Sequence, residues 1–271
     1  MAEATKFVPK GILLDVDGTL TNSRKEIPPK TLKVIEKFSK AGIFCGVSTS
    51  RHYAFIKNYI LPHFPKNSLH VTSGGGQIVT PSGNVIWQKT INGNKVKSVI
   101  QEVERLGGAV IFGSNSKLYC SDIIYDNVKN HPWKVDARRF RKTDQYEVTL
   151  LSIVQVNPRV IKYVKSVKNI RAWLLRNSSG AQYYDIVAKG VNKLTGARIW
   201  CRQLGIGLKD VLAVGDNKND YELISKVGFG VAMGDSTEKL KRVSKKIIGK
   251  VDNEALSRFL ASLLVRGNAH R

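Results

Sequence analysis

Short apolar runs alternate with amphipathic stretches in the first part of the chain. The apolar runs predict buried strands over Gly11–Asp15, Ile43–Val47 and Leu69–Thr72. The stretches between them predict helices over Lys30–Ala41, which Gly42 would stop, and Arg51–Ile60. Strands that alternate with helices in this way favour a parallel sheet joined by right-handed crossovers.

The pattern changes after a hairpin that is predicted over Gln77–Trp87. From about Lys89 onward, several β-like runs surround only two predicted helices, Lys95–Leu106 and Pro158–Val167. The β-like runs are Ala109–Phe112, Leu118–Cys120, Val148–Val156 and Ala172–Leu175. This part of the chain therefore predicts an α+β unit inserted into an α/β protein.

The alternation of strands and helices resumes at about Asp185. It continues with a helix, a strand, a helix, a strand and a closing helix, over Lys193–Leu204, Val211–Gly215, Tyr221–Val227, Phe229–Met233 and Asn253–Leu264. We therefore expect a discontinuous α/β core made of residues 1–88 and 184–271, with an α+β insert over residues 89–183.

Composition and length limit the classes of protein to consider. The chain has 271 residues, 42% of them hydrophobic, which is enough for a full core. No apolar run approaches the roughly 18 residues that span a bilayer, and residues 1–10 lack the apolar centre of a signal peptide. The three cysteines lie far apart, as is typical of a reducing compartment. We expect a cytoplasmic protein.

The formal net charge of +23 is unusual. It is compatible with electrostatic attraction of anionic substrates, with nucleic-acid binding, or with a solvated surface rich in lysine. No RNP aromatic pair or zinc finger accompanies the charge, so the solvated surface is the favoured interpretation. A basic stretch in the insert, which contains Lys134, Arg138, Arg139 and Arg141, is a candidate to favour a substrate with a second anionic group.

Two aspartates follow the first predicted strand, in the run Asp15-Val16-Asp17-Gly18-Thr19. Two carboxylates at this spacing project into one crevice and repel each other unless a cation lies between them. The hard oxygen ligands suit Mg²⁺. Asp15 is then the candidate nucleophile, and Asp17 the candidate general acid and base. The alternative is a turn-forming cap without chemistry.

Hydroxyl groups and a lysine provide candidate phosphate contacts. Thr49 and Ser50 end the second predicted strand and open a helix, where side-chain hydroxyls and free N–H groups suit a phosphate, although an N-cap would look the same. Lys193 begins a later helix and is placed to neutralise phosphate oxygens. Lys189 is the less favoured choice, and a surface lysine is the plain alternative.

A second acidic segment follows the strand Val211–Gly215. Asp216 would complete the ligand set of the metal, Asp220 would bind or orient the metal, and Asn219 would donate a hydrogen bond to phosphate. An Asx-rich turn is the alternative. In open α/β sheets, ligands bind beyond the carboxyl ends of the strands. All four polar segments are predicted to lie at that edge.

The chain resembles the haloacid dehalogenase superfamily, specifically its Cof-type phosphatases, over nearly its whole length. The resemblance rests on five motifs: DVDGTL from Asp15, STSR from Ser48, GVNK from Gly190, GDNKND from Gly215 and GVAMGDS from Gly230. It implies a Rossmann-like parallel sheet core with an inserted α+β cap domain. It also implies Mg²⁺-dependent hydrolysis of a small phosphorylated metabolite through an aspartyl-phosphate at Asp15.

Residue roles follow from the same resemblance. It implies acid and base work by Asp17, phosphate contacts from Thr49 and Lys193, and magnesium held by Asp15, Asp216, often Asp220, and the carbonyl of Asp17. The chain departs from the pattern of these relatives at three places. Ser50 stands where they usually have glycine, Gly74 where they usually have asparagine, and Asp235 where they usually have asparagine.

Two other functions stay open at this point. A phosphohexomutase similar to the phosphomannomutases of the same superfamily shares DVDGTLT and the run Asn219-Asp220-Tyr221-Glu222. Its arginine-rich signature for a sugar phosphate is not clearly present. A non-enzymatic binder of polyanions would use the basic charge, and it would not need the acidic motifs.

Overall fold

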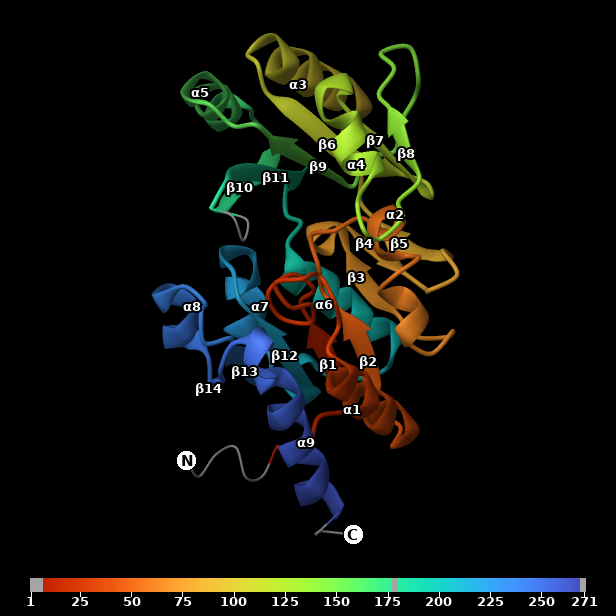
Figure 1. Ribbon diagram of the computed structural model, residues 1–271, viewed down its shortest axis with the longest axis vertical. Coiled ribbons are helices and arrows are strands. Elements are labelled where there is room, and N and C mark those ends of the chain that lie inside the picture. Colours follow the sequence, from red (N-terminus) through yellow and green to blue (C-terminus); the bar gives the residue numbers. More distant parts are fainter. Residues whose placement is uncertain (1–6, 177–179, 269–271) are drawn as a thin grey trace.

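The molecule consists of a core, which holds a five-stranded and a three-stranded sheet, and a smaller cap, which holds a six-stranded sheet (Figure 1). The computed structural model describes residues 7–176 and 180–268. The core contains strands β1 (Gly11–Leu14), β2 (Phe44–Val47), β3 (His70–Thr72), β4 (Gln77–Val79), β5 (Val85–Gln88), β12 (Val211–Gly215), β13 (Phe229–Ala232) and β14 (Lys246–Ile247). Its helices are α1 (Pro29–Lys40), α2 (Tyr53–Ile56), α6 (Lys193–Gln203), α7 (Tyr221–Ile224), α8 (Glu238–Val243) and α9 (Ala255–Asn268).

The main core sheet is parallel throughout, in the order β14-β13-β12-β1-β2. A parallel bridge between Ser48 and Val71 brings β3 beside β2. Side chains of β1 alternate between two apolar clusters, with Ile12 and Leu14 on one face and Leu13 on the other. Helices α1 and α9 contribute to the first cluster, and α6, α7 and α8 contribute to the second. The predicted α/β core is confirmed.

The cap is built on a second sheet, in the order β10-β11-β9-β6-β7-β8. Its strands are β6 (Ala109–Ser114), β7 (Lys117–Cys120), β8 (Ala137–Arg139), β9 (Leu150–Val154), β10 (Ile170–Arg176) and β11 (Gln182–Ala188). Its helices are α3 (Gly93–Arg105), α4 (Tyr125–Lys129) and α5 (Pro158–Ser166). All neighbouring strands are antiparallel except β7 and β8. The predicted α+β insert is confirmed.

The two faces of the cap sheet have different surroundings. Helices α3 and α5 bury the outer face, because Phe112, Leu151 and Ile186 share a cluster with their apolar residues. On the inner face, Ser152 of β9 lies in register between Asp185 of β11 and Ile111 of β6. The inner face of the cap sheet is the one that faces the core.

The boundary expected between residues 183 and 184 falls inside β11. Residues Tyr184–Val187 of this strand pair with β9, so hydrogen bonding holds them in the cap sheet. The return to the core pattern inferred from about Asp185 was therefore placed too early. We propose that the insert covers residues 89–188 and that the core resumes just before α6.

One predicted helix is much shorter than expected. The region predicted as a helix from Arg51 to Ile60 contains only α2, and residues 57–60 form turns. The helix starts after Arg51 because the His52 side chain accepts the N–H of Ala54 at 3.1 Å and takes the N-cap position. Pro62 also disfavours helical geometry at the preceding residue. Arg51 is therefore free of the helix and is available to the site.

Candidate active site

The predicted polar segments meet at one edge of the core sheet. Strand β1 lies between β12 and β2, so the loops that follow these three strands leave the sheet side by side (Figure 1). Asp15 donates its backbone N–H to Val214 at 3.0 Å. Carboxylate oxygens of Asp15, Asp216 and Asp220 lie within 4.8 Å of one another. Residues more than 200 positions apart in the chain therefore share one cluster.

Lys193 neutralises part of this acidic cluster. Its side chain is only 1% exposed, and its Nζ donates to Asp15 at 2.8 Å and to Asp220 at 2.6 Å. Burial opposes the charged form, but the two carboxylates raise the pKa of Lys193 above its usual range. A capping box formed by Asn192 and Thr195 starts α6 at this residue and fixes where the lysine enters the site.

The cluster still carries more negative charge than its lysine balances. Burial raises the pKa of Asp15 to about 6, although Lys193 opposes this shift. Burial and the neighbouring Asp15 raise the pKa of Asp216 well above its usual range. Oδ1 of Asp216 is buried and accepts no hydrogen bond from the described residues. Three carboxylates with one ammonium and one unpartnered oxygen fit a bound divalent cation.

Gly18 permits the close approach of the two loops that carry these aspartates, the loop after β1 and the loop after β12. It has a positive φ of 76°, and a Cβ at this position would lie 2.6 Å from Oδ2 of Asp216. Only glycine tolerates both conditions without moving the carboxylate. The glycine after Asp17 therefore allows the loop after β1 to pack against the loop after β12.

Asp220 is more fully occupied than Asp216. One of its oxygens accepts the Lys193 ammonium, and the other accepts the backbone N–H groups of Asp216 at 3.2 Å and Asn217 at 3.0 Å. These bonds hold the loop after β12 and the side chain of Lys193 in position. Both roles that sequence analysis offered for Asp220, metal binding and orientation, stay predictions.

Asp17 is held by two cations. Arg51 donates Nε to one carboxylate oxygen at 2.6 Å and Nη2 to the other at 2.8 Å, and Lys25 adds a bond of 3.1 Å. Burial alone would raise the pKa of Asp17, but these cations hold it well below its usual range. Sequence analysis missed both partners, although Arg51 belongs to one of the quoted motifs.

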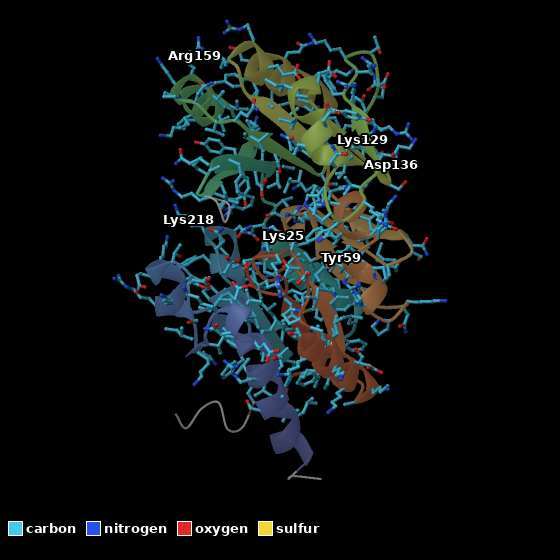
Figure 2. The ribbon with its side chains drawn as sticks, viewed as in Figure 1. Lys25, Tyr59, Lys129, Asp136, Arg159 and Lys218 are labelled. Carbon is cyan, nitrogen blue, oxygen red and sulfur yellow. The ribbon has the colours of Figure 1, made fainter. Side chains whose placement is uncertain are left out.

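A tryptophan from the cap completes the surroundings of Arg51. The Arg51 guanidinium lies 4.1 Å from the ring centre of Phe55 and 4.6 Å from that of Trp133. Trp133 is 1% exposed and donates Nε1 to the carbonyl of Lys25 at 3.0 Å. Trp133 also stacks on Tyr59. Figure 2 labels Tyr59 and Lys25, which lie near the junction of core and cap. The cap is therefore anchored beside Asp17.

The three remaining candidate phosphate contacts also reach this edge of the sheet. Thr49 is buried, and its Oγ1 accepts the N–H of Arg51 at 3.1 Å, so it forms a local turn and does not cap α2. Asn219 donates Nδ2 to Oγ of Ser50 at 2.8 Å. Oδ1 of Asn219 is buried and has no hydrogen-bond partner among the described residues.

Asp185 of the cap also belongs to this region, and sequence analysis gave it no role. Its carboxylate is 1% exposed and accepts the hydroxyl of Ser152 at 2.6 Å. Burial raises the pKa of Asp185 to about 6, although the nearby hydroxyl groups of Ser152 and Ser50 oppose this shift. A lone acid in a β-like run carried no recognisable signal.

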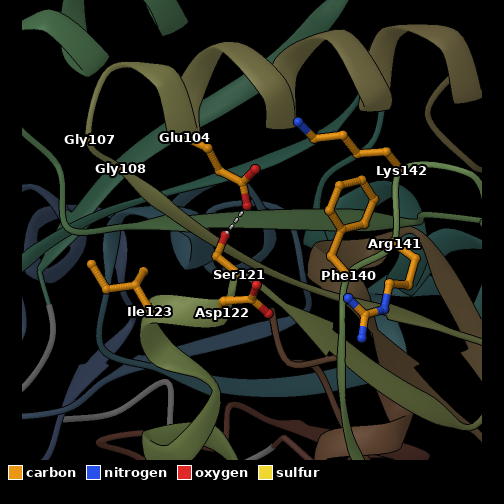
Figure 3. Close-up of a pocket in the computed structure, with 9 residues that line it drawn as sticks. All are labelled: Glu104, Gly107, Gly108, Ser121, Asp122, Ile123, Phe140, Arg141 and Lys142. Atoms are coloured by element: carbon orange, nitrogen blue, oxygen red, sulfur yellow. Dashed lines mark hydrogen bonds between the residues drawn. The ribbon is translucent and has the colours of Figure 1, made fainter.

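The arginines of the basic stretch form ion pairs within the cap. Arg138 pairs with Asp136, which Figure 2 labels, and Arg139 pairs with Asp122. With Arg141, these two arginines line a cavity of about 340 Å³ that no candidate site residue lines. A larger cavity of about 560 Å³ lies between the end of α3 and residues 121–123 and 140–142, again only in the cap (Figure 3). That the basic stretch favours a substrate with a second anionic group stays a prediction.

Within the described residues, no helix is both long enough and apolar enough to cross a bilayer. The Asp15, Asp216 and Asp220 group is also the only cluster of three or more potential metal ligands found within that part of the chain.

Comparison with known proteins agrees with this geometry. The chain is 24% identical over 258 residues to an HMP-PP phosphatase of Yersinia pseudotuberculosis, covering 91% of this chain and 92% of that protein. It is 23% identical over 268 residues to a phosphoglycolate phosphatase of Methanobrevibacter smithii, covering 92% and 97%. A haloacid dehalogenase-like hydrolase structure from Bacteroides thetaiotaomicron matches with a TM-score of 0.81 at 20% identity, over 94% of this chain and 100% of that one.

The family comparison covers almost the whole chain. Residues 12–260 match the sequence model of the haloacid dehalogenase-like hydrolases. This range includes the core sheet, the inserted cap and every residue of the acidic cluster. The chain therefore belongs to the haloacid dehalogenase-like hydrolase family.

Proposed function

We propose that this protein is a magnesium-dependent phosphatase that hydrolyses small phosphate monoesters through an aspartyl-phosphate at Asp15. That the chain is a phosphoric monoester hydrolase follows from its family and from relatives that are phosphatases. The observation that carries the finer proposal is the buried cluster itself. Asp15 is bonded to Lys193 and lies beside an unpartnered oxygen of Asp216.

The reaction has two halves, each with a defined role for the side chains. In the first, an oxygen of Asp15 forms a bond to phosphorus while the ester bond breaks, and Asp17 gives a proton to the departing oxygen. In the second, a water oxygen forms a bond to phosphorus while the bond from phosphorus to the Asp15 oxygen breaks, Asp17 takes the proton of that water, and inorganic phosphate leaves. Asp15 and Asp17 then return to their starting forms.

The state of Asp17 suits the second half of this reaction. Paired with Arg51 and Lys25, Asp17 is a carboxylate, which is the form that accepts a proton from water. To act as an acid, Asp17 must first carry a proton, which these two cations oppose. We infer that substrate entry separates Asp17 from at least one of them.

The acidic cluster is the proposed magnesium site. Asp15 and Asp216 would supply carboxylate oxygens, Asp17 its backbone carbonyl, and Asp220 either an oxygen or the orientation of the others. Bound there, Mg²⁺ would offset negative charge between Asp15 and the incoming phosphate. The unpartnered Oδ1 of Asp216 supports this assignment.

Lys193, Thr49, Asn219 and Ser50 are the proposed residues around the phosphoryl group. Lys193 already bonds to Asp15, so its ammonium is placed where phosphate oxygens would arrive. Thr49 and Asn219 lie on the loops after β2 and β12. Ser50 accepts a hydrogen bond from Nδ2 of Asn219. The proposed substrate class is a sugar phosphate or a phosphoglycolate-like ester.

A phosphate-release screen tests the proposal. The wild type and Asp15→Asn are incubated with a panel of phosphorylated metabolites, with Mg²⁺ and with a chelator. We expect release of inorganic phosphate only by the wild type with Mg²⁺. Equal release by Asp15→Asn would contradict the assignment of the nucleophile. Conversion of a hexose 1-phosphate to the 6-phosphate without phosphate release would instead identify a phosphohexomutase.

A further inference from the structure

Two cations hold the Asp17 carboxylate, and they leave one place on it open. Oδ1 accepts Nη2 of Arg51 at 2.8 Å and Nζ of Lys25 at 3.1 Å, and Oδ2 accepts Nε of Arg51 at 2.6 Å. A carboxylate has about four acceptor sites, two on each oxygen. Among the described residues, Oδ2 therefore keeps one free acceptor site. The Asp17 side chain is 36% exposed, so a water molecule can reach this site.

One cap residue contacts both cation-bearing residues. Trp133 lies in the cap segment between α4 and β8 and is buried. Its ring centre lies 4.6 Å from the Arg51 guanidinium, and its indole Nε1 donates to the backbone carbonyl of Lys25 at 3.0 Å. The ring attracts the guanidinium and limits where it can turn, and the indole N–H holds the loop that carries Lys25. Trp133 therefore acts on both partners of Asp17.

Core side chains give Trp133 a fixed orientation. Its ring stacks on Tyr59, with ring centres 5.5 Å apart and planes 10° apart, and it meets the ring of Phe55 edge to face at 5.8 Å. The backbone carbonyl of the next residue, Lys134, accepts Nδ2 of Asn58 at 2.9 Å. These core residues belong to α2 and to the turns after it. Aromatic contacts on two sides leave the indole little freedom to rotate.

We propose that Trp133 is a positioning residue that keeps both cations on Asp17 and so keeps the free site of Oδ2 open toward the water that hydrolyses the aspartyl-phosphate. This inference rests on the proposed phosphatase function. In that step, the water oxygen bonds to phosphorus, the bond from phosphorus to the Asp15 oxygen breaks, and Oδ2 of Asp17 takes the water proton. The step needs an oriented carboxylate, which is the state of Asp17 in the structure. Formation of the aspartyl-phosphate needs Asp17 as a proton donor and gains nothing from the two cations.

Trp133→Phe tests this role, because phenylalanine keeps a ring and removes the indole N–H. The probe is p-nitrophenyl phosphate with Mg²⁺, because its leaving group departs as a stable anion and makes little demand on Asp17. With enzyme in excess over the probe, rapid acid quench follows phosphorylated enzyme as it forms and breaks down. We expect breakdown to slow by about fivefold or more, as the loss of one hydrogen bond would allow, and formation to change by less than about twofold.

Two further variants separate positioning from general damage. Trp200→Phe is the matched control, because Trp200 is also buried and its Nε1 donates to a backbone carbonyl, that of Leu69, at 2.7 Å. Trp200 belongs to the apolar cluster on the other face of the core sheet, so its variant should form and break down phosphorylated enzyme as the wild type does. Lys25→Met leaves Trp133 in place and removes one cation. It should also slow breakdown, and it gives a separate test if Trp133→Phe folds poorly.

The outcomes distinguish this role from the proposed function. Equal slowing of formation and breakdown in Trp133→Phe would mean a general effect on the site and would overturn the proposal. Breakdown in Trp133→Phe as fast as in Trp200→Phe, or unchanged breakdown in Lys25→Met, would also overturn it while the phosphatase function stands. A wild type that forms no phosphorylated enzyme and releases no phosphate would overturn the proposed function, and this inference with it.

Discussion

At the scale of single residues, Lys193 is the most informative side chain. It is a buried ammonium between Asp15 and Asp220, and its two short bonds join the end of β1 to the loop after β12. A buried charge is stable only when it is paired, so the lysine and the carboxylates depend on one another. The same pairing places a cation where phosphate would bind.

Replacing Lys193 with methionine should therefore damage both activity and stability. We expect phosphate release to fall by about 100-fold or more, and the melting temperature to drop, because buried carboxylates lose their counter-charge. Lys189→Met is the control, since Lys189 is exposed and should tolerate the change. Phosphate release and thermal unfolding measure the result. Normal activity in Lys193→Met would rule out this account of the lysine.

His70 makes the stability of the core depend on pH. It is fully buried, its Nδ1 accepts the N–H of Val47, and burial lowers its pKa to about 3, against 6.5 for a free histidine. Below pH 6.5 the unfolded chain binds a proton that the folded protein does not. The free energy of unfolding should therefore decrease as the pH is lowered below 6.5. At pH 5 the loss from this residue should be about 2 kcal/mol.

Urea unfolding at neutral pH and near pH 5 checks this prediction. His70→Gln should lose less stability on acidification than the wild type does. His63→Gln, at an exposed histidine, should behave as the wild type does. Identical losses in all three proteins would show that His70 does not carry the effect.

Some site residues could be predicted from the sequence, and others could not. Asp15, Asp216 and Lys193 were predicted because each stands beside a clear strand or helix signal, and the structure brings them together. The partners of Asp17 were missed, because ion pairs between distant residues leave no local pattern. Asp185 was missed for the same reason, since its hydrogen bond from Ser152 on another strand exists only once the cap is folded.

At the scale of elements, the loop after β1 determines how closely the acids approach. Gly18 gives this loop its positive φ and its contact with Asp216. Gly42, after α1, has a similar φ of 80°, but a Cβ there would meet no atom within 4 Å. The two glycines therefore differ in one respect, which is the carboxylate beside Gly18.

Gly18→Ala and Gly42→Ala form a matched pair. Both should lose about 1–2 kcal/mol of stability, because alanine is strained at positive φ. Only Gly18→Ala should lose activity, by about 100-fold, because its Cβ displaces Asp216. Denaturant unfolding and phosphate release give the two values. An active Gly18→Ala would mean that the contact between the two loops is not needed for the reaction.

Elements that a continuous apolar run marks were predicted well, and short elements without such a run were not. Strands β1, β2 and β12 are buried on both faces, so continuous apolar runs mark them. Strands β8 and β14 and helix α4 are short, and β14 is exposed, so they carry little periodic signal. Helix α2 was predicted too long: the pattern did not reveal the cap made by the His52 side chain at its start, nor the turns that replace the helix after Ile56.

At the scale of the whole molecule, the cap is anchored through Trp133. This cap residue belongs to the main apolar cluster of the core, stacks on Tyr59 and bonds to the Lys25 carbonyl. Ala54 of the core in turn belongs to a cluster made mainly of cap residues. The two parts therefore share apolar contacts on the side of α2, next to Asp17.

Trp133→Ala should weaken this junction strongly. Loss of a large buried ring typically costs about 3–5 kcal/mol. Trp87→Ala is the control, because Trp87 is only half-buried, on β5. Urea unfolding followed by circular dichroism compares the two variants. Equal costs in both would show that Trp133 does not join the cap to the core.

Identifying the side chain that accepts the phosphoryl group is the most direct test of the central claim. The wild type is mixed with a substrate and Mg²⁺, quenched in acid and reduced with borohydride, which converts an aspartyl-phosphate to homoserine. Peptide mass spectrometry then locates the product. Our account predicts homoserine at position 15 and unchanged aspartate at positions 17, 216 and 220. Homoserine at one of those three positions, or at none during turnover, would contradict it.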